Sequence, residues 1–245
     1  MVRCRFASAP VIAALLMASC GIARAEPRAL LELFTSQGCS SCPAADKLLG
    51  ELANDSSLVA LSVPIDYWDY LGWKDTLAMP GHTARQKAYS HVRGDREVYT
   101  PQVVVNGVAQ ALGSDRAEIE KAVAQSHHKT SALSVPVRVT VADERVTVNL
   151  PSGEGEAAGE VWLCPLSRSV PVGIGRGENH GRTITYTNVV RRWVKLGSWS
   201  GKSETFTVPI DAIKSAGIDA VAVIVQSGSV EKPGPMLGAS LASLR

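Results

Sequence analysis

Two cysteines, Cys39 and Cys42, lie between an apolar run and a helical pattern, and this arrangement constrains the fold more than any other stretch of the chain. The run Ala29 to Phe34 holds one polar residue, Glu32, and predicts a buried strand. Apolar residues then recur at helical spacing from near Cys39 to Leu52. We therefore expect a cysteine at a helix N-terminus, where unpaired backbone N–H groups and the helix dipole favour a thiolate.

The next elements extend this pattern into an α/β unit. Leu58 to Ile65 is a second strand-like run, and a strand, helix, strand order requires a parallel pair joined by a right-handed crossover. Asn106-Gly107 between two apolar runs predicts a two-residue hairpin turn, with Pro101 at the start of its first strand. A helix follows from about Asp115, and Glu118 is expected to complete its capping box.

An insertion interrupts this unit before the hairpin. It opens with an aromatic cluster from Asp66 to Trp73 and ends in a short helix predicted at Ala84 to His91. One interpretation is a hydrophobic clasp that fixes the insertion to the domain. The other is a partly exposed surface near the cysteines, in which Tyr67, Trp68 and Trp73 contact a bound peptide.

The first 25 residues have the pattern of a cleaved export signal. Arg3 and Arg5 precede an apolar run that is too short to span a bilayer, and Ala23-Arg24-Ala25 forms a small-x-small cleavage site. We therefore expect a periplasmic or secreted protein. Cys20 follows a lipobox-like sequence, so lipidation at Cys20, with attachment to a membrane, is the alternative.

The charge of the mature chain excludes some partners. Removing the leader takes away three arginines and no acid, so the 25 basic residues fall to 22 against 23 acidic ones. A nearly neutral chain gives no support for nucleic-acid binding. Export also places the cysteines in an oxidising compartment, where disulfides persist.

The pattern of the chain changes after residue 134. Residues 127–134 are polar and lack apolar periodicity, which indicates a linker. Alternation at 137–141 and 146–150, with strand candidates at 160–166, 183–190, 203–208 and 220–225, predicts a mainly antiparallel β-sandwich. The expected organisation is a leader at 1–25, an α/β domain with a helical and aromatic insertion at 26–130, and a β-sandwich domain at 131–245.

The Cys39 and Cys42 pair is compatible with several kinds of chemistry. A zinc site needs two further ligands at close spacing, and the adjacent His127-His128 in the linker does not provide the usual spacing. A copper site with two thiolates and one histidine stays open. The other interpretations are a redox-active dithiol and a structural disulfide. We expect neither a metal nor a cofactor.

Four segments carry a resemblance to a known family: FTSQGCSSCPAADKLL, DYWDYLGWKD, VYTPQVVVNG and GRGENHGRTITYTNVVR. They resemble the secreted bacterial proteins of domain-of-unknown-function family 1223, and a dithiol followed by a proline before a hairpin resembles the thioredoxin-like superfamily. The resemblance implies a thioredoxin-like first domain in which Pro101 is cis and lies against the Cys39–Cys42 disulfide. The chain departs from thioredoxin itself at Gly38, where an active-site tryptophan would stand, and at Ser40-Ser41 between the cysteines.

These observations predict an exported thiol–disulfide oxidoreductase that acts on protein cysteines, with a redox partner protein as a further expected contact. Cys39 would attack and Cys42 would resolve the mixed disulfide, while Pro101 would form the wall beside a substrate chain. Glu32 is a candidate acceptor for the Cys42 proton, or else a strand-end carboxylate that reaches solvent. The rival hypothesis is a non-catalytic thioredoxin-fold binding module in which Cys39 and Cys42 form a structural disulfide.

Two features fall outside this scheme. Cys164 lies in an alternating strand, where it is a small core residue or a cysteine that joins another chain. The loop Gly173 to Arg182 is rich in glycine and charge. It is either a long hairpin connection at the domain interface or an anion-binding nest with Arg176 and Arg182 nearby.

Overall fold

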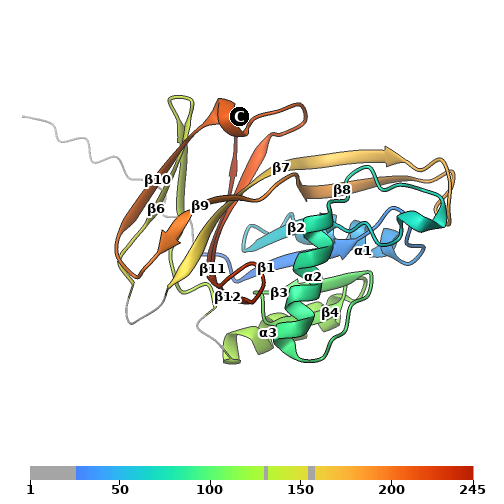
Figure 1. Ribbon diagram of the computed structural model, residues 1–245, viewed down its shortest axis with the longest axis horizontal. Helices are drawn as coiled ribbons and strands as arrows, with labels where there is room; N and C mark the ends of the chain where they lie inside the picture. The colour runs from blue at the N-terminus through green and yellow to red at the C-terminus, as the bar shows by residue number, and fades with distance from the viewer. Residues whose placement is uncertain (1–25, 130–131, 154–157, 245) are drawn as a thin grey trace, which may run out of the picture.

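The computed structural model describes residues 26–129, 132–153 and 158–244 (Figure 1). The expected leader with Cys20, and the expected domain boundary at 130/131, lie outside these residues. The helices are α1 (Cys42–Leu52), the short 3₁₀ turn η1 (Asp69–Leu71), α2 (Pro80–Arg93), α3 (Arg116–Lys129) and α4 (Ile210–Ile213). The strands are β1 (Ala29–Thr35), β2 (Leu58–Pro64), β3 (Gln102–Val105), β4 (Ala109–Leu112), β5 (Arg138–Ala142), β6 (Arg145–Leu150), β7 (Gly159–Gly173), β8 (Thr183–Val190), β9 (Val194–Trp199), β10 (Glu204–Pro209), β11 (Ala220–Gly228) and β12 (Pro233–Ser243).

Most of these strands belong to one nine-stranded sheet, in the order β12-β11-β7-β8-β2-β1-β3-β4, with β9 paired to β7. β1 and β2 are parallel and α1 connects them, as the strand, helix, strand order predicts. β3 is antiparallel to β1 and forms a hairpin with β4. β8 runs parallel to β2 where Ser62 pairs with Val189, so strands from the C-terminal half continue the sheet of the N-terminal half.

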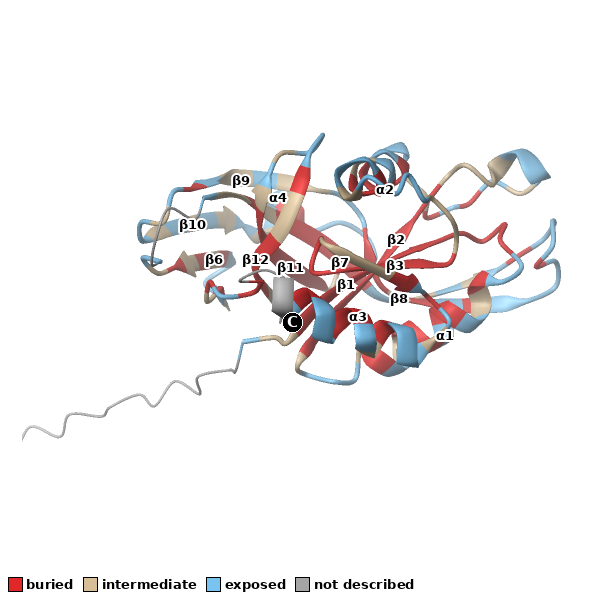
Figure 2. Ribbon diagram, turned by 90° about the horizontal axis from the view of Figure 1, so that it is seen from below, coloured by how far each residue is buried: buried red, intermediate tan, exposed pale blue. Residues whose placement is uncertain are grey.

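Helices cover both faces of this sheet around β1. Alternation along a strand sends Leu30 and Phe34 to one face, where they pack with Tyr89 of α2. Leu31 and Leu33 point to the other face and pack with residues of α1 and α3. Figure 2 shows buried residues concentrated in the sheet between α2 and the α1/α3 pair. The two faces of β1 therefore belong to two different cores.

A second, three-stranded antiparallel sheet has the order β10-β6-β5. Val146, Val148 and Leu150 of β6 pack with Val161 and Leu163 of β7 and with apolar residues of β11. The apolar alternation at 137–141 and 146–150 therefore predicted β5 and β6 correctly. The small sheet lies against the C-terminal part of the large one.

Turn chemistry accounts for several element boundaries. Asn106 and Gly107 have φ values of 50° and 73°, as the predicted two-residue hairpin turn requires. α2 starts at Pro80, whose missing N–H is tolerated in a first turn, and ends before Gly94 at φ 79°. The helix is therefore longer than the predicted Ala84 to His91. None of the helices in the described ranges is long and apolar enough to cross a membrane.

Several further features differ from the sequence predictions. α1 begins at Cys42, so Cys39 lies in the turn before the helix. Glu118 accepts a hydrogen bond from the Leu112 backbone N–H, so it does not complete the expected capping box, although Asp115 caps α3. The sequence patterns also missed β9 and β12. β12 is rich in small residues, and a side chain at Gly238 would collide with the backbone of Val135.

Candidate functional site

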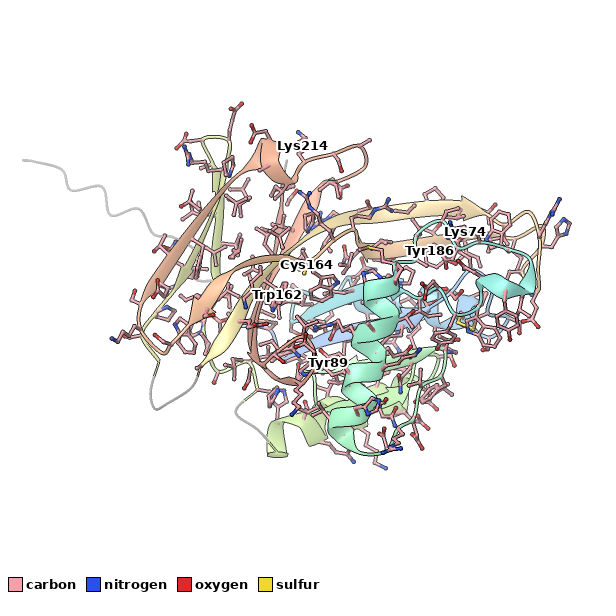
Figure 3. The ribbon with its side chains drawn as sticks, in the orientation of Figure 1. Lys74, Tyr89, Trp162, Cys164, Tyr186 and Lys214 are labelled. Carbon is pink, nitrogen blue, oxygen red and sulfur yellow. A yellow bond between two sulfur atoms is a disulfide. The ribbon has the colours of Figure 1, made fainter. Side chains whose placement is uncertain are left out.

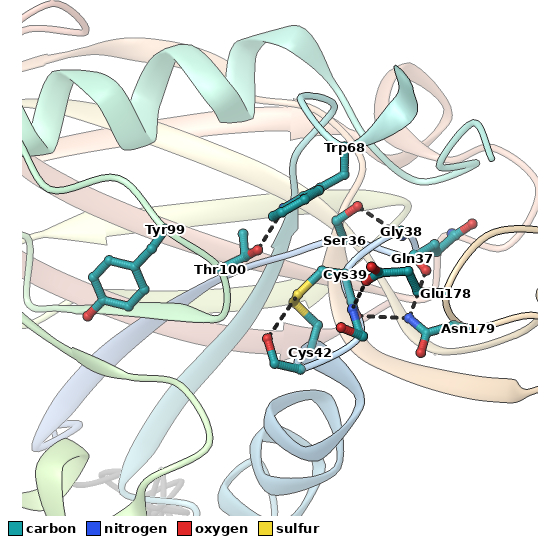
Figure 4. Close-up of a disulfide and its surroundings, with 12 residues drawn as sticks. Ser36, Gln37, Gly38, Cys39, Cys42, Trp68, Tyr99, Thr100, Glu178 and Asn179 are labelled. Carbon is teal, nitrogen blue, oxygen red and sulfur yellow. Dashed lines mark hydrogen bonds between the residues drawn. A yellow bond between two sulfur atoms is a disulfide. The ribbon is translucent and has the colours of Figure 1, made fainter. Parts of the chain in front are cut away.

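Cys39 and Cys42 form a disulfide at the N-terminal end of α1, with their Cα atoms 5.4 Å apart (Figure 4). The Cys42 N–H donates to the Cys39 carbonyl at 3.2 Å, which closes the turn before the helix. Cys39 is 2% exposed and Cys42 is fully buried, whereas Ser40 and Ser41 between them are exposed. The Ser41 hydroxyl lies 3.4 Å from Cys39 Sγ. The pair is thus reached from the side of the two serines.

The loop from Gly173 to Arg182 directly contacts the turn from Ser36 to Cys42, called the cysteine turn. The buried Asn179 side chain donates hydrogen bonds to the carbonyl oxygens of Gln37 at 3.0 Å and Cys39 at 2.8 Å. Glu178 accepts a hydrogen bond from the Ser40 N–H at 3.2 Å. The β7–β8 connection therefore fixes the backbone of the turn (Figure 4). Sequence reasoning passed over Asn179, because an asparagine in a glycine-rich loop is typical of a turn.

The aromatic insertion holds the same turn from another side. Trp73 Nε1 donates to the Gln37 side-chain oxygen at 2.9 Å, and the Asp75 carboxylate accepts from the Gln37 N–H at 2.7 Å. Trp73 also packs with Ile174 and Tyr186 of the β7–β8 hairpin. Contacts of this kind are expected if the insertion is a hydrophobic clasp that is fixed to the rest of the domain.

Trp68 and its neighbours lie closer to solvent. A Cβ added at Gly38 would lie 3.1 Å from Trp68 Cβ, so this tryptophan adjoins the cysteine turn. Tyr67 and Trp68 are half-buried, whereas Tyr70 is 78% exposed and stacks on Trp68 with ring centroids 6.4 Å apart. The exposed aromatic that stacks on Trp68 is therefore Tyr70, which the predicted substrate surface did not include.

Pro101 lies beside the first turns of α1, and the Thr100–Pro101 peptide bond is cis. A Cβ at Gly113 would lie 3.1 Å from Pro101 Cβ and 3.3 Å from Ala45 Cβ, so these residues surround one small space. Thr100 Oγ1 accepts a hydrogen bond from Trp68 Nε1 at 2.8 Å. Pro101 and Trp68 thus adjoin the end of α1 that carries the cysteines.

Glu32 is fully buried and engaged in an ion pair. Its carboxylate accepts hydrogen bonds from Arg85 Nε at 2.6 Å and from the Tyr89 hydroxyl at 2.6 Å. Arg85 also donates to the Gln226 side chain of β11 at 2.8 Å. Glu32 lies between Leu30 and Phe34 at every second position of β1, so the three side chains point to the same face of the sheet. Its carboxylate is therefore on the α2 face and not on the α1 face. The solvent-reaching alternative does not hold either, since α2 covers this carboxylate.

Cys164 lies in β7 and is a free, buried thiol (Figure 3). Burial raises its pKa, and the Glu32 carboxylate raises it further against the opposing effect of Arg85. The residue packs in the same core as Phe34 and Tyr89, as expected for a small core residue.

Asp46 is the buried acid that sequence reasoning missed. It lies on α1, one turn after Cys42, and is 1% exposed. Burial raises the pKa of its carboxyl to about 8; the Thr35 hydroxyl lowers this pKa and Asp75 raises it. Neither carboxylate oxygen has a hydrogen-bond partner among the described residues, since the Thr35 hydroxyl lies near but without bonding geometry. The available signal was its position four residues after Cys42, between the apolar Ala45 and Leu49.

Metal ligands do not gather around the disulfide. Within the described residues, no group of three or more histidine, cysteine, aspartate or glutamate side chains is arranged to hold a metal ion. His127, which lies far along the chain from the turn that carries Cys39 and Cys42, donates a hydrogen bond from Nε2 to the Arg28 backbone oxygen at 2.6 Å. The described site offers the two sulfur atoms of the disulfide and, one helical turn after Cys42, the buried acid Asp46.

Comparison with known proteins places the chain in a family. Residues 30–226 match the family described as "Protein of unknown function (DUF1223)". No curated protein matches the chain. The crystal structure of protein AGR_C_4864 from Agrobacterium tumefaciens is 30% identical, with 91% of this chain and 97% of that chain covered and a TM-score of 0.81. HBP35 of Porphyromonas gingivalis is 13% identical, with 89% and 76% covered and a TM-score of 0.53, a likeness of fold alone. The chain thus belongs to the family of proteins of unknown function DUF1223.

Proposed function

We propose that this protein is an exported thiol–disulfide oxidoreductase that acts on protein cysteines through Cys39 and Cys42. The observation that carries the proposal is the position of the disulfide, which closes the turn immediately before α1. A thiolate formed there faces the unpaired N–H groups and the positive end of the helix dipole, which lower the cost of the negative charge.

The exchange proceeds through a mixed disulfide. A substrate thiolate attacks Cys39 Sγ, the Cys39–Cys42 bond breaks, and Cys42 leaves as a thiolate. A second substrate thiolate then attacks the substrate sulfur, so that a substrate disulfide forms and the Cys39 thiolate is released. The substrate loses two electrons and the protein gains them; the reverse sequence reduces a substrate disulfide. A redox partner protein resets the pair in either direction.

The order of the N-terminal elements supports the thioredoxin-like first domain of this proposal. The parallel β1–α1–β2 unit, the β3–β4 hairpin and α3 occur in the expected order. Pro101 lies against the helix that begins with Cys42, as a wall for a substrate chain would. Trp68 and the exposed Tyr70 supply an aromatic surface beside the cysteine turn. Export follows from the leader expected at residues 1–25.

A second candidate function rests on the contacts of Asn179. Its two hydrogen bonds hold the carbonyls of Gln37 and Cys39, and Cys39 is only 2% exposed. A turn fixed in this way also suits a binding module in which the disulfide is purely structural. The two functions differ in the reduction potential and in the ability to form a mixed disulfide.

The reduction potential is the first test. The mature protein is equilibrated in glutathione buffers, free thiols are alkylated, and the modified fraction is measured by mass spectrometry. An oxidoreductase is expected to have a potential above about −300 mV, whereas a value below that belongs to a structural disulfide.

Trapping of substrates is the second test. A Cys42→Ser variant produced in the exported compartment is expected to accumulate mixed disulfides at Cys39, because no resolving thiol is present. Cys39→Ser is the matched control, since of the pair it leaves only the fully buried Cys42. Equal trapping by the two variants, or none by either, would contradict the proposed function.

A further inference from the structure

Cys42 and Asp46 occupy neighbouring positions on one side of α1. They are four residues apart in a helix, a spacing that places Cβ atoms about 5–6 Å apart on the same face. Cys42 is fully buried and Asp46 is 1% exposed, so both side chains point into the protein. This spacing brings a carboxyl close to the sulfur that must leave, and later return, during disulfide exchange, directly or through one water molecule.

Among the described residues, no basic side chain lowers the pKa of Asp46. Thr35 at the end of β1 presents a hydroxyl that makes no hydrogen bond among the described residues. Asp75 of the insertion adds a like charge. Burial raises the pKa of the Tyr186 hydroxyl on β8, and the Asp46 and Asp75 carboxyls raise it further. Acidic and neutral groups from β1, β8 and the insertion therefore face this carboxyl.

A buried carboxyl without a partner is costly when ionised, and burial in this protein keeps the group protonated at neutral pH. The structure contains the disulfide form, in which Cys42 has no proton. A neutral acid beside a bound sulfur can give its proton to the thiolate that forms when the S–S bond breaks. The group is thus in the protonation state that opening of the disulfide requires.

We infer that Asp46 is the proton-transfer residue for Cys42, an inference that rests on the proposed function. As a thiolate attacks Cys39, the S–S bond breaks, and Cys42 takes the proton of the Asp46 carboxyl, leaving a carboxylate. On closure the Asp46 carboxylate takes the proton back, and the Cys42 thiolate attacks Cys39 Sγ and displaces the substrate thiolate. Protons and electrons balance in both directions. The sequence-based candidate for this role, Glu32, lies on the other face of β1 and is paired with Arg85.

The test is the pH dependence of disulfide opening by dithiothreitol, which needs no protein substrate. The oxidised mature protein is mixed with excess dithiothreitol between pH 6 and 9.5, thiols are alkylated at intervals, and each rate is divided by the concentration of the dithiothreitol thiolate. For the wild type, this rate constant is expected to fall about tenfold or more as pH rises through about 8, because the acid is lost. For Asp46→Asn, it is expected to be low and independent of pH.

Two further variants and one measurement on the wild type complete the test. Asp46→Glu keeps a carboxyl and is expected to restore part of the pH dependence, while Glu51→Gln, an exposed acid on the same helix, keeps the wild-type profile. If Asp46→Asn does not fold, carbon-13 NMR of aspartate-labelled wild type follows the carboxyl that titrates near pH 8. Its midpoint is expected to change when the disulfide is reduced, because Cys42 and Asp46 then share a proton.

The outcomes separate the inference from the proposed function. Three outcomes would overturn the role of Asp46. They are a pH profile that Asp46→Asn leaves unchanged, a profile that Glu32→Gln abolishes instead, and an Asp46 titration midpoint that does not change when the disulfide is reduced. Failure of Cys42→Ser to trap any substrate removes the proposed function, yet the dithiothreitol profile would still report whether Asp46 protonates Cys42.

Discussion

Glu32 and Asp46 are both buried carboxyls beside β1, but they lie on opposite faces of the sheet and in opposite environments. Glu32 has an arginine and a tyrosine hydroxyl within hydrogen-bonding distance. Asp46 has no hydrogen-bond partner among the described residues. A buried charge that is fully paired holds elements together, whereas a buried acid left unpaired has a shifted pKa and is a candidate for chemistry.

The two faces of β1 differ in the same way. On the α2 face, Arg85 connects Glu32 to Gln226 of β11 and stacks over Trp193 at 4.2 Å, so one ionic cluster joins distant parts of the chain. On the α1 face, the polar groups near the cysteine turn mostly bind its backbone or lack partners. We expect changes on the first face to alter stability and changes on the second to alter disulfide chemistry.

The α2 face of β1, which carries Glu32, is called the Glu32 face. The largest expected effect is the loss of protein stability when the ion pair on this face is broken. Arg85→Met leaves Glu32 buried without its cation, and a broken buried ion pair costs about 3–5 kcal/mol. Urea unfolding followed by circular dichroism measures the free energy of unfolding. The control is Arg116→Met, which removes a half-exposed partner of Glu51 and is expected to cost less than about 1 kcal/mol. Equal losses in the two variants would remove the distinction between the faces.

On the α1 face of β1, where Asp46 lies, the expected change in protein stability on mutation of Asp46 depends on pH. The pKa of Asp46 is about 8 in the folded protein against an ordinary 3.8. Between these values the folded protein holds a proton that the unfolded chain has released, so wild-type stability falls as pH rises through this window. Asp46→Asn lacks this loss, because an amide does not titrate.

Relative to the wild type, Asp46→Asn is therefore expected to gain stability steadily between pH 4 and pH 8, by about 1.4 kcal/mol for each pH unit. Urea unfolding of both proteins at several pH values measures this gain. A difference that stays constant over the whole window would show that Asp46 is ionised in the folded protein.

Asn179→Ala tests whether the β7–β8 loop controls the disulfide. The variant removes the side-chain donor that binds the carbonyls of Gln37 and Cys39, at a cost of about 1–2 kcal/mol in unfolding free energy. Dithiothreitol is expected to reduce the disulfide several times faster, because the turn is less firmly held. His180→Ala changes the exposed neighbour and is the control. If the disulfide is reduced more slowly or at the same rate, the loop stabilises the structure but does not control the disulfide.

Local patterns were enough to predict part of this site. Apolar runs and the helical repeat predicted β1, α1 and β2, and Asn106-Gly107 predicted the hairpin, because these signals act within a few residues. The partners of Glu32 could not be predicted, since Arg85 and Gln226 are brought to it only by the folded sheet.

Local sequence patterns were also not enough to predict the contacts around the cysteine turn. The contact of Asn179 with the cysteine turn joins residues 140 apart in sequence, which no local pattern encodes. Asp46 was passed over because a charged residue in a helix usually lies on the solvent face, and its burial depends on β1 and β8 packing over α1.

The smallest expected effect concerns Cys164, the free cysteine on the Glu32 face. Its raised pKa and complete burial predict that iodoacetamide at pH 8 leaves it unmodified in the folded protein, because the thiolate is the reacting form. Cys164→Ala is expected to cost about 1 kcal/mol by leaving a small cavity, with the dithiothreitol reduction rate of Cys39–Cys42 unchanged. Mass spectrometry of alkylated peptides and urea unfolding provide the two measurements. Native-state labelling at the rate of a free thiol would mean that the Glu32 face also opens to solvent, and the contrast between the two faces would fail.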